Sequence, residues 1–100
     1  MKKIVLITGG SSGLGLQLVQ DFVSEGHEVI SVSRSEEKIK KAIEKLGSTG
    51  CKFISGDISK DDTREKVSEF VRDKYGKLDV LINNAGITYL GGIEVLENNE

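Results

Sequence analysis

The chain has 100 residues, which is enough for one domain. Hydrophobic residues make up 37% and charged residues 30%, and the net charge of −2 excludes a strongly basic face for nucleic acid or anionic membranes. No apolar run approaches the roughly 18 residues of a membrane span, and the single cysteine excludes an intrachain disulfide and favours a reducing, cytoplasmic location. We therefore expect neither nucleic acid nor a membrane among its partners.

Short apolar runs alternate with amphipathic segments along the chain. Residues 4–7 form a continuous and mostly β-branched run, which is typical of a strand buried on both faces. After a glycine-rich turn, Leu14, Leu18 and Phe22 recur at every fourth position and predict a helix. The same patterns predict three further strands at 29–33, 51–55 and 79–83, and two further helices, one between a Ser35 cap and Gly47 and one over 61–75.

The order of these elements predicts the fold. Strands that alternate with helices imply parallel strands joined by right-handed crossovers. We therefore predict an α/β fold, the N-terminal half of a doubly wound parallel sheet, with the order βαβαβαβ and strands arranged 3-2-1-4. Residues 1–86 would form this dinucleotide-binding half-domain, and residues 87–100 a loop or the start of a further element.

The glycine-rich turn, residues 8–15, joins the first strand to the first helix. A helix N-terminus presents unpaired N–H groups and the positive end of the helix dipole, which together suit a pyrophosphate. Glycines allow close approach of the backbone, and serine hydroxyls can donate to phosphate or ribose oxygens. The predicted cofactor site therefore includes Gly9, Ser11, Ser12, Gly13, Leu14 and Gly15. The alternative is an ordinary tight turn between a strand and a helix.

The spacing of this turn, T-G-x-x-x-G-x-G, resembles the short-chain dehydrogenase/reductase family, whose nucleotide-binding half is a Rossmann fold. Asp57 after the third strand and the Asn-Asn-Ala-Gly sequence at 83–86 also match the family. The resemblance implies that Asp57, with Ile58 beside it, binds the adenine. It also implies that Asn84 supports the sheet and that the backbone of Ala85 and Gly86 lies along the adenine ribose. Extended-type sugar epimerases fit less well, because their glycines are usually spaced T-G-x-x-G-x-x-G.

Ser33 and Arg34, at the end of the second strand, indicate which dinucleotide is bound. Relatives that use NAD have an acidic residue there, which holds the ribose hydroxyls. A serine followed by a guanidinium favours a 2′-phosphate instead, and a charge-assisted bond of roughly 1.5–3 kcal/mol corresponds to about a 10–100-fold preference. We therefore expect NADP(H) to be preferred over NAD(H). The alternative is that Arg34 pairs with Glu36 or Glu37.

The family's reaction is hydride transfer between a nicotinamide and a carbonyl or alcohol carbon, and the resemblance implies a Tyr-x-x-x-Lys pair that handles the proton. Tyr75 is followed at the fourth place by Asp79, and Tyr89 by Ile93, so neither fits. We predict no catalytic or metal-binding residue here. The chain is then expected to be the nucleotide-binding part of an NADP(H)-dependent oxidoreductase, inactive alone, which meets its small-molecule substrate in a longer protein. A stand-alone NADP(H)-binding sensor or interaction module, or a minimal or designed fold without activity, remains open.

Three smaller expectations concern single elements. If no strand follows, the apolar residues 80–82 of the fourth strand form an unpaired sheet edge, which predicts self-association. His27 lies in a polar turn and is predicted to be a surface residue. Cys51 begins a strand and is expected to be packed rather than reactive.

Overall fold

The computed structural model describes residues 2–47, 50–84 and 97–98. Every helix and strand predicted from the sequence is present, and one short strand is added. The elements in chain order are β1 (Ile4–Thr8), α1 (Gly13–Ser24), β2 (Glu28–Ser33), α2 (Glu36–Leu46), β3 (Cys51–Ser55), α3 (Asp61–Lys74), β4 (Val80–Asn83) and β5 (Glu97–Asn98). Within the described residues, none of the helices has the length and apolar character needed to cross a membrane.

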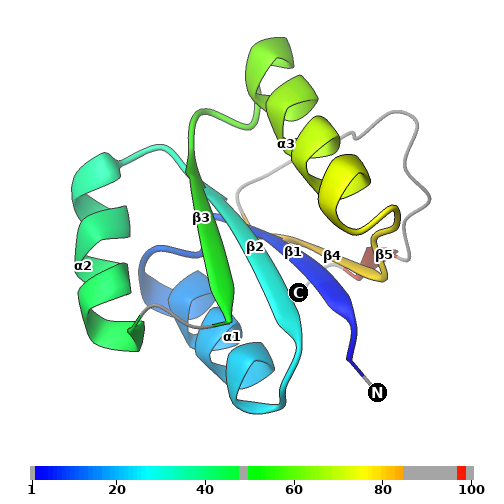
Figure 1. Ribbon diagram of the computed structural model, residues 1–100. Helices are drawn as coiled ribbons and strands as arrows, with labels where there is room; N and C mark the ends of the chain where they lie inside the picture. The colour runs from blue at the N-terminus through cyan, green and yellow to red at the C-terminus, as the bar shows by residue number, and fades with distance from the viewer. Residues whose placement is uncertain (1, 48–49, 85–96, 99–100) are drawn as a thin grey trace.

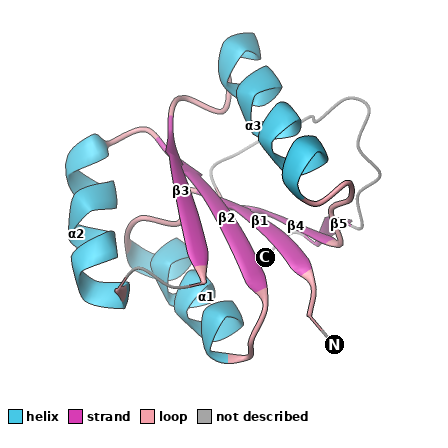
Figure 2. Cartoon of the chain, viewed as in Figure 1, coloured by secondary structure: helices cyan, strands magenta, loops and turns pink. Residues whose placement is uncertain are grey.

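The strands form one parallel sheet in the order β3-β2-β1-β4-β5 (Figures 1 and 2). Its first four strands confirm the predicted order 3-2-1-4 of a Rossmann-type fold. In the register, Leu6 of β1 lies between Ile30 of β2 and Leu81 of β4. Because the strands are parallel, the segments that follow β1, β2 and β3 leave the sheet at the same edge, where ligands of such folds bind.

The outer edge of β4 differs from the expectation. β5 runs parallel to β4 and pairs Glu97 with Leu81 and Asn98 with Ile82. The prediction of an unpaired edge was therefore wrong at these two positions, and part of the segment expected to be a loop or the start of a further element is a strand. Two residues are too few to show a hydrophobic period, so pairing with a distant strand was the deciding factor. Self-association through this edge stays a prediction, although the backbone of Leu81 and Ile82, whose unpaired groups motivated it, is paired with β5.

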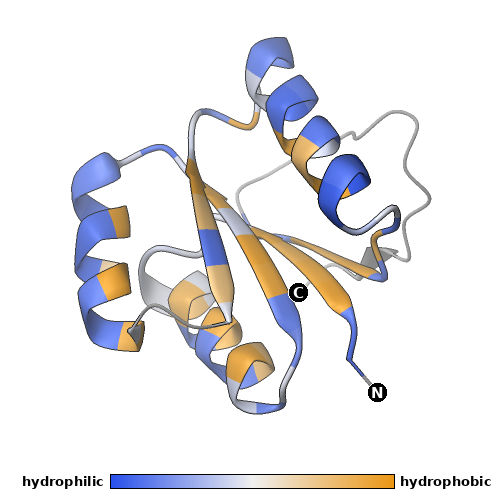
Figure 3. Cartoon of the chain, in the orientation of Figure 1, coloured by the Kyte–Doolittle hydropathy of each residue, from blue (hydrophilic) through white to orange (hydrophobic). Residues whose placement is uncertain are grey.

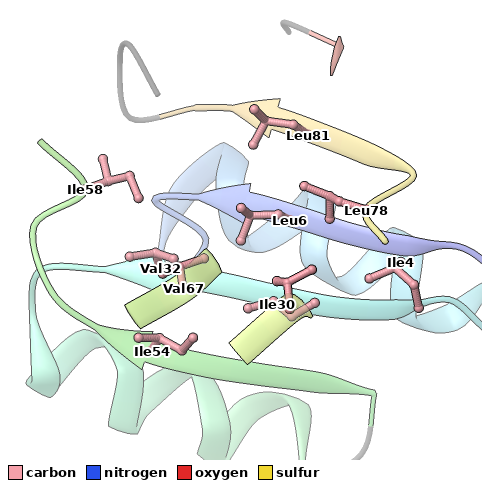
Figure 4. Close-up of a cluster of buried hydrophobic side chains, with 10 residues drawn as sticks. Ile4, Leu6, Ile30, Val32, Ile54, Ile58, Val67, Leu78 and Leu81 are labelled. Carbon is pink, nitrogen blue, oxygen red and sulfur yellow. The ribbon is translucent and has the colours of Figure 1, made fainter. Parts of the chain in front are cut away.

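Apolar side chains lie in two layers, one on each face of the sheet. α1 and α2 cover one face and α3 covers the other (Figure 1), and the helices turn their polar sides outward (Figure 3). Alternate residues of β1 serve the two layers: Leu6 belongs to the cluster with α3 (Figure 4), and Val5 and Ile7 belong to the cluster with α1. All three are fully buried, and burial of such a side chain contributes about 1.5–3 kcal/mol. This double coverage explains why β1 reads as a continuous apolar run.

The start of β1 is held by the loop before β4. The backbone N–H of Ile4 donates to Asp79 Oδ2 at 2.8 Å, and the N–H of Asp79 donates to the Ile4 carbonyl at 2.9 Å. The bond from Ile4 is the main reason why the pKa of Asp79 lies below its usual 3.8, with Lys77 as a further cause. The charged carboxylate of Asp79 therefore stabilises the folded chain.

Replacing Asp79 with alanine is expected to lower the free energy of unfolding by about 1 kcal/mol at pH 7, because the Ile4 N–H loses its acceptor. A carboxyl group whose folded pKa is depressed stabilises the protein above its unfolded pKa, and that contribution disappears as the pH falls through the lower folded value. The difference between wild type and variant should therefore shrink below pH 3.8. Urea unfolding at pH 7 and pH 3 measures it, and an equal difference at both values would contradict this role.

His27 is less exposed than the sequence suggested. Its side chain is 13% exposed, and its ring lies 5.8 Å from the Phe22 ring, centroid to centroid. Its Nδ1 atom accepts the backbone N–H of Lys3 at 3.0 Å. The expectation of a surface residue rested on the polar neighbours in the sequence, whereas in the structure Lys3, before β1, and Phe22, in α1, partly cover the ring.

Candidate nucleotide-binding site

The turn between β1 and α1 has the backbone shape expected of a phosphate-binding turn. Gly9 and Gly13 have φ values of 73° and 57°, in the left-handed region that favours glycine. Ser12 is the N-cap of α1 in an extended conformation, and its side chain makes no capping hydrogen bond. The Ser12 side chain therefore accepts no hydrogen bond from the first N–H groups of α1. They are placed to bind an anion.

Gly10 is essential to this turn, although the sequence analysis did not single it out. A Cβ atom on Gly10 would lie 2.2 Å from Ser31 Oγ and 2.8 Å from Val19 Cγ2. The buried Ser31 hydroxyl accepts the N–H of Gly10 at 3.1 Å and donates to the carbonyl of Ile7 at 2.9 Å. A serine inside an apolar strand was the available signal, because a buried hydroxyl needs partners.

Gly15 and Asn84 fix the other side of the turn. A Cβ atom on Gly15 would lie 2.1 Å from the Gly9 carbonyl oxygen and 2.7 Å from Asn84 Nδ2. Asn84 Nδ2 donates to that same carbonyl at 3.2 Å. Gly15 thus permits the close approach of α1 to the turn after β1, and Asn84 supports the turn from the end of β4.

A cleft of about 820 Å³ opens beside this turn, at the carboxyl ends of the strands. This volume lies within the range of about 300–1,000 Å³ that is typical of small-molecule sites. Three segments contribute its walls: the glycine-rich turn, the segment after β2 and the segment after β3. The lining residues are Gly9, Ser11, Ser12, Val32, Ser33, Arg34, Ser35, Lys38, Gly56, Asp57, Ile58 and Ser59.

The predicted site residues fall into three groups in the structure. The first group lines the cleft: Gly9, Ser11, Ser12, Ser33, Arg34, Asp57 and Ile58. The second group shapes the turn or begins α1 without lining the cleft: Gly13, Leu14, Gly15 and Asn84. Ala85 and Gly86 lie outside the described residues. The structure therefore brings the predicted pyrophosphate, ribose and adenine residues to one cleft.

Ser33 is the most informative residue of the cleft. It ends β2 and is only 5% exposed. Its Oγ atom is buried and has no hydrogen-bond partner within the described part of the chain. A buried hydroxyl without a partner is unfavourable by roughly 1–3 kcal/mol, and native structures rarely leave one unexplained. The residue lines the cleft, and its hydroxyl would have to rotate out of its buried position to meet a ligand there.

Two cations follow Ser33 along the cleft wall. Arg34 is exposed, and Lys38 lies in the first turn of α2. The alternative pairing of Arg34 with Glu36 or Glu37 is not found among the ion pairs of the described residues, and Glu37 pairs instead with Lys41 at 3.4 Å. Sequence reasoning missed Lys38 because its pattern does not distinguish it from the other lysines of this helix. Its place three residues after the Ser35 cap was the signal that it lies at the helix start.

Asp57 is held as a charged acceptor on the opposite segment. Its Oδ1 atom accepts the hydroxyl of Ser59 at 2.7 Å and the N–H of Ser59 at 2.9 Å. These bonds, with the nearby positive charges of Arg34 and Lys60, lower the pKa of Asp57 below its usual value. An ionised carboxylate only accepts hydrogen bonds, so Asp57 can bind a donor such as an amine near neutral pH.

The described residues outside the cleft show no second reactive site. No group of three or more His, Cys, Asp and Glu side chains within them could hold a metal ion. Cys51 packs against the apolar cluster of β1 and α1, as expected, and burial raises the pKa of its thiol to about 12, which disfavours the thiolate. Burial also raises the pKa of Tyr75, whose hydroxyl donates to Glu28 at 3.4 Å. Tyr89 lies outside the described residues.

The strand order, the turn that opens α1 and the position of the cleft define the chain as a Rossmann-type α/β protein. Residues 3–100 match the family model of the short chain dehydrogenases. The chain therefore belongs to the short chain dehydrogenase family. It is 42% identical over 94 residues to an uncharacterised oxidoreductase of Thermotoga maritima. The aligned region covers 92% of this chain and 37% of that relative.

Solved structures give the same result. Salutaridine reductase from Papaver somniferum superposes with a TM-score of 0.77 and 30% identity, over 86% of this chain and 31% of that protein. L-sorbose reductase from Gluconobacter frateurii, solved in complex with NADPH and L-sorbose, superposes with a TM-score of 0.72 and 33% identity, over 86% of this chain and 34% of the reductase. The chain thus spans about a third of the length of the proteins that it resembles.

Proposed function

We propose that the cleft binds a nicotinamide dinucleotide and that the chain is the nucleotide-binding part of a short-chain oxidoreductase. The observation that carries this proposal is the cleft at the carboxyl ends of the strands, which is lined together by the glycine-rich turn before α1, by Arg34 and by Asp57. The α1 N-terminus would hold the pyrophosphate, and Asp57 would accept a hydrogen bond from the adenine amine. A bound nicotinamide would exchange a hydride with a carbonyl or alcohol carbon. The residues described here bind and orient the cofactor.

We further propose that NADP(H) is preferred over NAD(H). A carboxylate at position 33 would repel a 2′-phosphate, whereas a serine with Arg34 beside it provides a donor and a positive charge. The NADPH complex of L-sorbose reductase supports this direction, because that reductase shares the fold at 33% identity. The cytoplasmic location expected from the single cysteine is part of the same proposal.

The first test is calorimetric titration of the purified chain with NADP⁺ and NAD⁺, beside an Arg34→Ala variant. NADP⁺ should bind about 10–100-fold more tightly than NAD⁺, and the variant should lose most of that difference while its affinity for NAD⁺ is retained. Circular dichroism shows whether each protein is folded. A folded chain that binds neither dinucleotide would overturn the proposal and would favour a minimal fold without activity.

A further inference from the structure

The segment between β3 and α3, which brings Asp57 and Ile58 to one wall of the cleft, is tied to α3 by side chains of that helix. Arg64 Nη1 donates to the Ile58 carbonyl at 3.0 Å, and Lys66 Nζ donates to the Ser55 carbonyl at 3.1 Å. The Arg64 side chain is only 23% exposed, so most of it is covered by the protein. Arg64 thus connects the start of α3 to the backbone of a residue that lines the cleft.

The turn that begins at Asp57 is closed by hydrogen bonds of its own and by this bond from Arg64. The N–H of Lys60 donates to the Asp57 carbonyl at 2.9 Å, and both the N–H and the hydroxyl of Ser59 donate to Asp57 Oδ1. The Ile58 carbonyl, between them, accepts from the guanidinium. Within the described part of the chain, Asp57 Oδ2 accepts no hydrogen bond. It is therefore the oxygen that can accept one from a ligand.

The bond to Ile58 restrains this turn more than the second contact of Arg64, an ion pair with Asp61, can do. The Asp61 side chain is 88% exposed, and water and salt weaken an ion pair with so exposed a partner. Ile58 is only 6% exposed and belongs to the buried cluster with Val67 of α3 (Figure 4). A charge-assisted bond to its carbonyl fixes the backbone of a residue whose side chain is already anchored. The turn therefore has little freedom to move relative to α3.

We propose that Arg64 is a positioning residue, which acts through the Ile58 carbonyl to hold Asp57 where its carboxylate accepts a hydrogen bond from the adenine amine. This inference rests on the proposed dinucleotide function of the cleft. It gives a role to a side chain of α3 that does not itself line the cleft. Without the guanidinium, the turn would keep its bonds from Ser59 but would move relative to α3. Recognition of the amine should then weaken, whereas binding of the phosphates should not.

The test compares NADP⁺ with its hypoxanthine analogue, in which a carbonyl oxygen replaces the adenine amine. By calorimetry, the wild-type chain should bind NADP⁺ at least about tenfold more tightly than the analogue, as expected for one hydrogen bond to a charged group. Arg64→Met removes the guanidinium and should lower this ratio to about threefold or less. Lys66→Met is the matched control, because its residue donates to Ser55, which does not line the cleft. It should leave the ratio within about twofold of the wild-type value.

Two further variants separate a positioning role from a merely structural one. In an Asp57→Ala background, Arg64→Met should change the ratio no further, because both residues act on the same contact with the amine. Arg64→Lys keeps a cation on a shorter side chain and should give an intermediate ratio. It is the variant that decides if circular dichroism shows that Arg64→Met does not fold, and a wild-type or a fully lost ratio in it would then contradict the role.

The outcomes separate this inference from the function on which it rests. If a folded Arg64→Met chain keeps the wild-type ratio, or loses affinity for both ligands equally, the role of Arg64 is overturned and the proposed function stands. A wild-type chain that binds NADP⁺ and the analogue equally would also overturn it, because Asp57 would then not recognise the amine, although dinucleotide binding would stand. A wild-type chain that is folded and binds neither ligand would overturn both.

Discussion

Replacing Ser33 with aspartate is expected to reverse the cofactor preference. The new carboxylate would stand at the end of β2, at a residue that lines the cleft and is 5% exposed, and it would extend further than the serine hydroxyl does. It would repel the 2′-phosphate and accept hydrogen bonds from the ribose hydroxyls of NAD⁺. We expect the affinity for NADP⁺ to fall about 100-fold, which corresponds to roughly 3 kcal/mol, and the affinity for NAD⁺ to rise several-fold.

Ser33→Asn is the control, because it adds similar volume without charge. It should weaken NADP⁺ much less than Ser33→Asp does. Arg34 remains in both variants, so a difference between them reports the introduced charge. Unchanged discrimination in a folded Ser33→Asp protein would show that this position does not face the adenine ribose.

Gly15→Ala is expected to be the most destabilising single substitution in the turn. Its Cβ atom would lie 2.1 Å from the carbonyl oxygen of Gly9, and a backbone atom cannot rotate away as a side chain can. Relief requires α1 to move off β1, which would disturb the bond from Asn84 to the same carbonyl. Overpacking of this kind is unfavourable by about 3 kcal/mol, a large part of the stability of a small domain.

Gly13→Ala provides the comparison for this prediction. Nothing lies within 4 Å of a Cβ atom at Gly13, but its φ of +57° is strained for alanine. That strain is worth roughly 1–2 kcal/mol, so the loss should be smaller than for Gly15→Ala. Thermal and urea unfolding measure both variants. A Gly15→Ala protein as stable as Gly13→Ala would contradict the close contact between α1 and the Gly9 carbonyl.

The fold could be predicted because its signals are local. The apolar run of β1, the Ser35 cap and Gly47 at the end of α2 each lie within a few residues of the element they define. β5 could not be predicted in this way, since its two residues are recognisable only through their pairing with Leu81 and Ile82. The partial burial of the His27 ring could not be predicted for a similar reason, because its main-chain partner Lys3 is far away in the sequence.

The residues of the candidate site likewise fall into those that local motif spacing predicts and those that only the fold reveals. The motif spacing identified the glycine-rich turn and Asp57, which the structure brings to one cleft. The need for Gly10 arises from Ser31 on a neighbouring strand, and no spacing rule connects these two residues. Lys38 was missed because several lysines of α2 looked alike in the sequence, whereas only the fold distinguishes the one that lines the cleft from Lys41, which pairs with Glu37.

The most direct test of the central claim is an NMR titration of the ¹⁵N-labelled chain with NADP⁺. We expect saturable shifts of backbone amide signals in the three segments that line the cleft, which are the glycine-rich turn, residues 32–35 with Lys38, and residues 56–59. Amide signals from the opposite end of the sheet, such as those of Ile4 and Asp79, should not shift. Shifts that are absent, that do not saturate, or that gather away from these three segments would contradict the assignment of this cleft as a dinucleotide site.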